Sequence, residues 1–309
     1  MSMLSRCVFR TALVMLACAA PAWAHDPEGP ACEAASGAAT AHEVETPAPE
    51  VAASGEAEPV ELNHCPVCGK DSVFKPYGNP PRERVRCPVC GTMERHRLLY
   101  FFLEDHPEIL ASNASVLHFG PNRGLEKRFR ERDDLQYYTA DLFKKKIDLT
   151  LDISDIKLPA ETFDVVIAYH ILEHVPADRR AMRELYRILK PGGWLIVQVP
   201  IYADRPDTDE DPSITDPKER TRRFGQHDHV RVYGWRDFVD RLQEAGFEVT
   251  VEQPGLKLDP ETIQRMRLVP DEQIYVCRKP GGDDETDRTA APAADDESGA
   301  VAEEAEEAS

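Results

Sequence analysis

Four regularly spaced cysteines are the residues of this 309-residue chain best suited to bind a metal ion. The pair Cys65 and Cys68 is followed, after 18 residues, by the pair Cys87 and Cys90, and both pairs read Cys-Pro-Val-Cys-Gly. Two such turns can direct four thiolates at one point and complete a tetrahedral zinc shell, which would be structural because no coordination position stays open. The duplicate pattern favours a small zinc ribbon over two disulfides or a redox Cys-x-x-Cys motif.

Five polar residues crowd together near the end of a long segment, residues 202–234. They are His227, Asp228, His229, Arg231 and Tyr233. The segment is too long for a plain loop of a compact domain and therefore suggests a lid or a substrate wall. Polar side chains of several types rarely gather for packing, so we take the five as candidates for acid–base catalysis or substrate contact. A second metal site among them would lack a clear ligand spacing.

Glycines and acidic residues follow the ends of several short apolar runs. Gly120-Pro121-Asn122-Arg123-Gly124 follows the first run, and glycine lets a ligand approach the backbone. Asp141 ends the second run 21 residues after Gly120, a spacing at which a carboxylate can accept hydrogen bonds from ribose hydroxyls. The same pattern recurs at the ends of the next two runs, with Asp152, Ile153 and His170.

Apolar patterns of strand length and helix length alternate from residue 115 onward. Strands are expected over residues 115–120, 135–142, 149–153, 163–170, 194–201, 248–252 and 273–278, and helices over 125–132, 180–190 and 235–245. We expect Pro191-Gly192-Gly193 to end the second helix. The alternation predicts an α/β fold with a Rossmann-like, mostly parallel, doubly wound sheet, in which ligands bind at the carboxyl ends of the strands.

Charge divides the chain into a nearly neutral centre and acidic ends. The net charge is -19, yet residues 25–61 hold nine acidic residues without Lys or Arg, and residues 281–309 hold eleven beside Arg288. These ends are poor in large apolar residues, so we expect an acidic disordered linker and an acidic disordered tail. The folded centre would comprise the ribbon over 62–97, a connecting helix over 98–114 and the main domain over 115–280.

This charge distribution and the hydropathy argue against two classes of function. Acidic ends around a neutral centre suit long nucleic acid poorly, because bound phosphates must be neutralised. The chain has no run of 18 apolar residues, which argues against an enzyme that spans a membrane. Residues 1–24 do resemble a cleavable secretory signal, with Arg6 and Arg10, an apolar stretch and Ala22-Trp23-Ala24. The alternative is an upstream extension whose composition mimics such a signal.

Residues 115–280 resemble the class I S-adenosylmethionine-dependent methyltransferases of the type 11 group. The resemblance rests on residues 116–120 (Val-Leu-His-Phe-Gly), Asp141, residues 151–153 (Leu-Asp-Ile), residues 163–167 (Phe-Asp-Val-Val-Ile), residues 170–175 (His-Ile-Leu-Glu-His-Val) and residues 187–193 (Arg-Ile-Leu-Lys-Pro-Gly-Gly). With the cysteines in front, and with residues 224–234 (Phe-Gly-Gln-His-Asp-His-Val-Arg-Val-Tyr-Gly), the chain looks like a zinc-ribbon subgroup of these enzymes.

The resemblance implies S-adenosylmethionine as cofactor and assigns residues to it. The turn from Gly120 through Asn122 to Gly124 would face its methionine part, with His170 nearby. Asp141 would bind the ribose, and Asp152 and Ile153 would face the adenine. The chain departs from the family at His118, where an acidic residue is usual, and at Asn122, where a third glycine is common.

Three hypotheses for function follow. The first is a methyltransferase acting on an unidentified small molecule, lipid or protein side chain. The second is a non-catalytic interaction module with a zinc ribbon and a decayed cofactor pocket, and the third is an RNA methyltransferase that grips RNA with the ribbon. We expect a cytoplasmic location, because the implied cofactor is made there and zinc-binding thiolates suit a reducing compartment. Export remains the alternative, and the sequence leaves the oligomeric state open.

Overall fold

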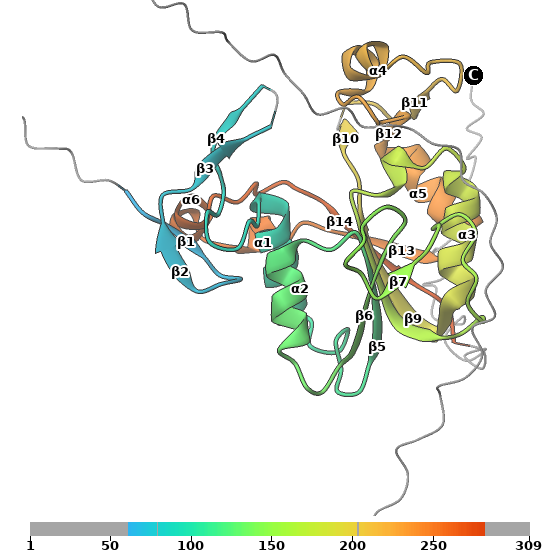
Figure 1. Cartoon of the computed structure of the whole chain (residues 1–309), viewed down its shortest axis with the longest axis horizontal. Coiled ribbons are helices and arrows are strands. Elements are labelled where there is room, and N and C mark those ends of the chain that lie inside the picture. The colour runs from blue at the N-terminus through green and yellow to red at the C-terminus, as the bar shows by residue number, and fades with distance from the viewer. Residues whose placement is uncertain (1–60, 79, 203, 282–309) are drawn as a thin grey trace, which may run out of the picture. The chain divides into compact units, whose positions relative to one another are not determined.

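The computed structural model of the chain describes residues 61–78, 80–202 and 204–281 (Figure 1). The predictions for residues 1–24, for the linker and for the acidic tail therefore lie outside the described residues, except at Glu61 and Gly281. None of the helices in the described ranges is long and apolar enough to cross a membrane.

A seven-stranded sheet forms the centre of the main domain. Its order is β13-β14-β9-β8-β5-β6-β7, and every pair is parallel except the two pairs that β14 makes. The strands are β5 (Ser115–Phe119), β6 (Gln136–Asp141), β7 (Leu149–Thr150), β8 (Phe163–Tyr169), β9 (Leu189–Gln198), β13 (Glu248–Glu252) and β14 (Ile274–Arg278). The predicted Rossmann-like, mostly parallel sheet is confirmed.

Helices cover both faces of this sheet (Figure 1). One face carries α1 (Glu94–Asp105) and α2 (Arg123–Arg130), and the other carries α3 (Asp178–Ile188) and α5 (Trp235–Glu244). The helical spacing of apolar residues explains this arrangement, because Met182, Leu185 and Ile188 of α3 fall on one side and are fully buried. Each such side chain contributes roughly 1.5–3 kcal/mol by leaving water.

Several elements differ from the expected bounds, and two of them differ for a visible reason. The helix expected over 98–114 begins earlier, at Glu94, and ends at Asp105; His96 Nδ1 accepts a hydrogen bond from Met93 N at its start. The third strand stops at Thr150, because the Asp152 carboxylate accepts from Ser154 N and turns the chain.

The expected break at Pro191-Gly192-Gly193 lies inside β9 instead of between helix and strand. Gly192 N donates to Lys279 O and Lys279 N donates to Gly193 O, so the residue after β14 continues the strand pairing here. A Cβ on Gly193 would lie only 2.9 Å from Asp164 O, which explains why glycine suits this close approach.

The ribbon consists of two short hairpins in front of α1. The first pairs β1 (Asn63–Cys65) with β2 (Lys70–Ser72), and the second pairs β3 (Lys75–Tyr77) with β4 (Arg82–Arg86). Arg97 of α1 is fully buried and fastens the ribbon to the C-terminal part of the domain. It donates to Val85 O at 3.1 Å and Thr92 O at 3.0 Å on the ribbon side, and to Met266 O at 2.7 Å.

That last contact is at the end of α6 (Pro260–Met266), which follows the short 3-10 helix η2 (Pro254–Lys257) between β13 and β14. The expected long segment after β9 forms a small three-stranded sheet of its own, in the order β10-β12-β11. Its elements are β10 (Ile201–Tyr202), β11 (Asp209–Glu210), α4 (Pro217–Phe224) and β12 (Arg231–Gly234). A further 3-10 helix, η1 (Leu172–His174), follows β8.

Candidate active site

The four ribbon cysteines converge on one point. Cys65 Sγ lies 3.5 Å from Cys90 Sγ, Cys68 Sγ lies 3.8 Å from Cys87 Sγ, and all four sulfurs are within 4.8 Å of one another. Zinc–sulfur bonds of about 2.3 Å in a tetrahedron place sulfurs roughly 3.8 Å apart, whereas a disulfide needs about 2.05 Å. The cysteines are free, and their spacing fits a zinc ion.

The second cysteine turn packs directly on the start of α2. A Cβ on Gly124 would lie 2.8 Å from Thr92 Cγ2 and 3.1 Å from Cys90 Cβ, so only glycine fits there. Asn122 caps α2 by accepting from Gly124 N at 2.8 Å and donates from Nδ2 to Gly91 O at 3.1 Å. Asn122 therefore joins the predicted cofactor turn to the ribbon, a contact that the sequence did not predict.

Gly120 and Asp141 meet at the carboxyl ends of β5 and β6. Gly120 has φ +57°, and a Cβ there would lie 3.9 Å from Asp141 Oδ2 and 2.7 Å from Ile171 Cδ1, beside the residue that follows His170. Burial alone would raise the pKa of Asp141, but the N–H groups of Phe143 and Lys144 and the Lys144 ammonium lower it. The turn thus has an open glycine backbone beside an ionised carboxylate, which fits a cofactor that carries ribose hydroxyls.

The remaining predicted cofactor residues differ in their exposure to solvent. Asp152 is exposed and accepts from Ser154 N and Oγ, each at 2.8 Å, while Ile153 is buried in the main core. His118, at the position where an acidic residue is usual, is 2% exposed, and its Nδ1 lies 2.9 Å from the Tyr137 hydroxyl. Burial lowers the pKa of His118 to about 3. His118 is therefore a neutral core residue that packs beside Phe129 and Tyr137.

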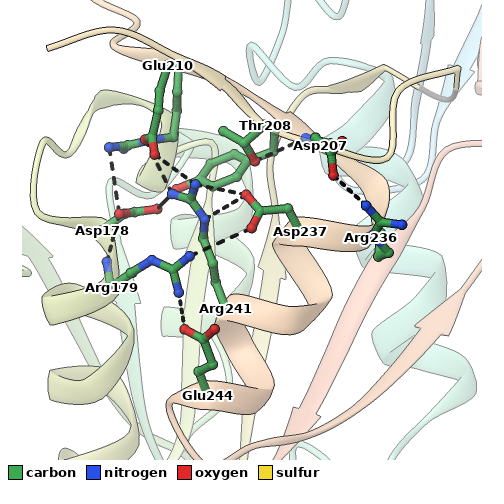
Figure 2. Close-up of polar contacts among 12 residues, drawn as sticks. Asp178, Arg179, Asp207, Thr208, Glu210, Arg236, Asp237, Arg241 and Glu244 are labelled. Atoms are coloured by element: carbon green, nitrogen blue, oxygen red, sulfur yellow. Dashed lines mark hydrogen bonds and ion pairs between the residues drawn. The ribbon is translucent and has the colours of Figure 1, made fainter.

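Arg231 and Tyr233 belong to a buried polar network. Tyr233 donates to Asp178 Oδ2 at 2.7 Å, and Arg231 Nε donates to Glu210 Oε2 at 2.8 Å. Figure 2 shows Arg241 of α5 between Asp178, Glu210 and Asp237 in the same network. Arg231 also donates to the backbone oxygens of Leu172, Val175 and Pro176. These contacts give both residues a positioning role for the segment after β8.

The other three candidate residues of the insertion, His227, Asp228 and His229, are not part of this network. His227 is 71% exposed and has only Asp228 nearby, at 3.8 Å. Asp228 Oδ2 lies 3.2 Å from His174 Nδ1, and the His229 ring packs edge-on against the His174 ring at 4.7 Å. Two of the three therefore face the 3-10 helix after β8.

A cavity of about 950 Å³ opens at the carboxyl ends of β8 and β9. One part of its wall is apolar and includes Val199, Trp235, Val239, Val251 and Tyr275. The polar part comes from the start of α1, the ends of β8 and β9, and the residues before β14. It includes Arg82 of β4, Glu94, His170, Gln198 and Glu272, and the cavity is also lined by Arg236, Asp240, Gln253, Asp271 and Gln273.

Four atoms of these lining residues have no hydrogen-bond partner among the described residues. They are Glu94 Oε2, His170 Nε2, Gln198 Oε1 and Glu272 Oε2. Gln198 Nε2 donates to Glu272 Oε1 at 2.5 Å, so the Gln198 oxygen is the free end of that amide. Burial raises the pKa of Glu272 to about 6, against the hydrogen bond from Gln198. Of these four residues, the sequence predicted only His170. The other three lie far apart in the sequence, so no local pattern shows that they line one cavity.

His170 occupies a strained position between this cavity and the glycine turn. Its φ is +53°, which is uncommon for a residue other than glycine and often marks a functional site. Its Nδ1 lies 3.1 Å from the charged Glu173 Oε1, outside hydrogen-bond geometry, and this charge contact favours the proton of the neutral imidazole on Nδ1 and a lone pair on Nε2. Burial lowers the pKa of His170 and favours this neutral form.

The sheet order, with β14 antiparallel between parallel neighbours, and the glycine turn beside Asp141 are features of the class I methyltransferase fold. The sequence profile described as "Methyltransferase domain" matches residues 92–252, more than half of the chain, and the chain belongs to that family.

Individual relatives share only parts of the sequence. A probable S-adenosylmethionine-dependent methyltransferase of Mycolicibacterium smegmatis is 26% identical over 101 residues, which cover 32% of this chain and 34% of that protein. The 27-O-demethylrifamycin SV methyltransferase of Amycolatopsis mediterranei is 29% identical over 118 residues, covering 38% and 41%. The chain thus spans less than half the length of these relatives. A solved S-adenosylmethionine-dependent methyltransferase from Mesorhizobium loti aligns with 60% of this chain and 97% of its own at 16% identity, with a TM-score of 0.41.

Proposed function

We propose that this protein transfers a methyl group from S-adenosylmethionine to the nitrogen of an amine bound in the 950 Å³ cavity. When bound, the cofactor supplies an activated methyl group on a sulfonium. The Gly120 turn would hold its methionine part and the Asp141 carboxylate its ribose, while one zinc ion in the cysteine site would hold the ribbon together. Four zinc-binding thiolates must stay reduced, so the proposal includes a cytoplasmic location.

The observation that carries the choice of an amine is the set of unpaired atoms in the cavity wall. All four atoms are hydrogen-bond acceptors: two carboxylate oxygens, one amide oxygen and one imidazole nitrogen. Buried acceptors without donors are costly, and a protonated amine brings several N–H donors and a positive charge. An anionic ligand would instead meet Glu94 and Glu272. The apolar wall beside Trp235 suits the hydrocarbon part of such a substrate.

Glu272 is the candidate base for this reaction. A protonated amine has no free lone pair, so one proton must leave the nitrogen before attack. The Glu272 carboxylate, with its pKa of about 6, is ionised at neutral pH and can take that proton. The lone pair then forms the N–C bond while the C–S bond breaks, with its electron pair left on sulfur. His170 lines the cavity and the next residue, Ile171, lies beside Gly120, so the two sites adjoin and can align the reacting atoms.

We expect Glu272→Gln to lower the methylation rate of an amine substrate by about 100-fold, which is typical for loss of a general base. The wild-type rate should rise with pH through about 6, and the variant should lose that rise. The measurement is transfer of a labelled methyl group to a panel of primary and secondary amines, alcohols and carboxylic acids. Asp271→Asn, at the neighbouring exposed cavity carboxylate, is the matched control and should change the rate only a few-fold. Transfer only to alcohols or acids would refute the amine assignment.

Protein stability provides a second readout for the same variant. The pKa of Glu272 is raised from its ordinary 4.5 to about 6 in the folded protein, so folding favours its protonated form. Stability from this group is therefore present below pH 4.5 and is lost as the pH rises through 6. In Glu272→Gln this loss should disappear, a difference of about 1–2 kcal/mol in urea unfolding between pH 4.5 and 7. Equal pH dependence in both proteins would contradict the burial of this carboxylate.

A further inference from the structure

Three potential metal ligands gather where the insertion meets the segment after β8. Glu173 and His174 belong to η1, and His229 precedes β12. One ligand atom from each of the three lies within 4.8 Å of the others. Neither chain segment could assemble the group alone, because 55 residues separate His174 from His229.

Both imidazoles have an oxygen atom close to their outer nitrogen, a carboxylate for His174 and a hydrogen-bonded backbone carbonyl for His229. His174 Nδ1 lies 3.2 Å from Asp228 Oδ2, and His229 Nδ1 lies 3.0 Å from Phe224 O. A histidine that binds a metal typically donates its other N–H group to a carboxylate or a backbone carbonyl in this way. The tautomers fixed by these contacts leave the Nε2 lone pair free on each ring. His174 Nε2 lies 3.9 Å from Glu173 Oε1.

The Glu173 carboxylate is an unsatisfied group at the centre of this cluster. Its side chain is 1% exposed, and neither oxygen accepts a hydrogen bond from the described residues. His170 Nδ1 is 3.1 Å from Oε1, but outside hydrogen-bond geometry for that oxygen. Burying an ionised carboxylate without such partners is expensive, and a bound cation removes that cost. The His174 side chain is 30% exposed and leaves a path by which an ion can enter.

We propose that Glu173, His174 and His229 bind a second divalent metal ion that fastens the insertion to the segment after β8. Two imidazoles and one carboxylate form a donor set that suits zinc, with a water molecule in the fourth position. Hydrogen bonds already join the same two segments, since Val230 N donates to Glu173 O at 3.0 Å and Arg231 donates to Leu172 O. The ion would hold the insertion against the segment after β8, and it would thereby stabilise the wall of the substrate cavity. This proposal is independent of methyl transfer.

The test is the metal content of the full chain after dialysis against zinc and removal of loosely bound ions. We expect His229→Ala to lower the content by one equivalent relative to the wild type. His227→Ala, two residues away and exposed, is the matched control and should leave the content unchanged. Because the result is a difference between variants, it does not depend on whether the ribbon is loaded. An unchanged content in folded His229→Ala would overturn the proposal.

A milder variant keeps the test decisive if His229→Ala fails to fold. Asp228→Asn changes a half-exposed residue whose carboxylate contacts His174 and accepts a hydrogen bond from Gln226 Nε2, so the fold should survive. Loss of such an orienting partner typically weakens metal affinity 10–100-fold. A competition titration with a coloured zinc chelator should show this weakening for one ion only. Unchanged affinity for every bound ion in Asp228→Asn would also overturn the proposal.

Discussion

Cys90→Ser should abolish zinc binding by the ribbon and unfold residues 62–97 around it. The ribbon consists of strands of three to five residues, and such a segment has little core of its own. A structural zinc ion supplies about 10 kcal/mol or more of apparent binding energy that is also folding energy. Losing one of four thiolates forfeits most of that energy. The measurement combines zinc content with limited proteolysis of the ribbon.

The effect of Cys90→Ser should extend to cofactor binding, because the Cys90 side chain and Thr92 pack on Gly124 and Asn122 is held by Gly91. A buried cysteine outside the ribbon provides the control. Cys277→Ala should retain the ribbon zinc, since Cys277 lies in β14 and takes no part in the cluster. Full zinc content and an intact ribbon in Cys90→Ser would show that the four thiolates do not share an ion.

The second large effect is expected for Asp178→Ala. The Asp178 side chain is 6% exposed and accepts from Arg241 Nη1 and Tyr233 OH, each at 2.7 Å, with Arg231 at 3.6 Å. Removing it leaves the buried guanidinium groups of Arg231 and Arg241 with only Glu210 and Asp237 as negative partners. Burial opposes the ionisation of Glu210, but its contacts with the two arginines outweigh burial and lower its pKa to about 2. Breaking a buried charge network in this way costs about 3–5 kcal/mol.

Urea denaturation measures this cost, and Figure 2 shows the matched control. Asp207 pairs with Arg236 at 2.5 Å near the same helix, but the Asp207 side chain is 76% exposed. Exposed ion pairs contribute about 0–1 kcal/mol, so Asp207→Ala should be nearly neutral. Similar losses of stability in the two variants would mean that the Asp178 network is not buried as described.

The sheet could be predicted because its signals are local. The buried runs at Val165 and Leu195 are continuous and apolar, and the α3 face repeats at helical spacing, so each element shows its type within a few residues. The cysteine cluster was predictable for the same reason, since its two turns repeat one short motif. That Gly120 and Asp141 lie close together could be predicted because parallel strands bring their carboxyl ends to one edge of the sheet.

The parts that sequence reasoning missed depend on distant partners. The crowding of polar residues in the insertion predicts acid–base catalysis or substrate contact for Arg231 and Tyr233, whereas Asp178 and Glu210, which place them in a buried network, lie 53 and 21 residues before Arg231. The polar wall of the cavity is a similar case. Glu94, Gln198 and Glu272 are ordinary polar residues in sequence, and only the fold brings them together in the wall of one cavity.

Cofactor binding tests the central claim most directly. We would titrate the zinc-loaded chain with S-adenosylmethionine in a calorimeter, together with Asp141→Ala. We expect saturable binding with one cofactor per chain, and an affinity about 10-fold or more weaker in the variant, since hydrogen bonds to a charged group contribute about 1.5–3 kcal/mol. No binding by folded, zinc-loaded protein, or equal affinity in the variant, would contradict the cofactor site described at Gly120 and Asp141.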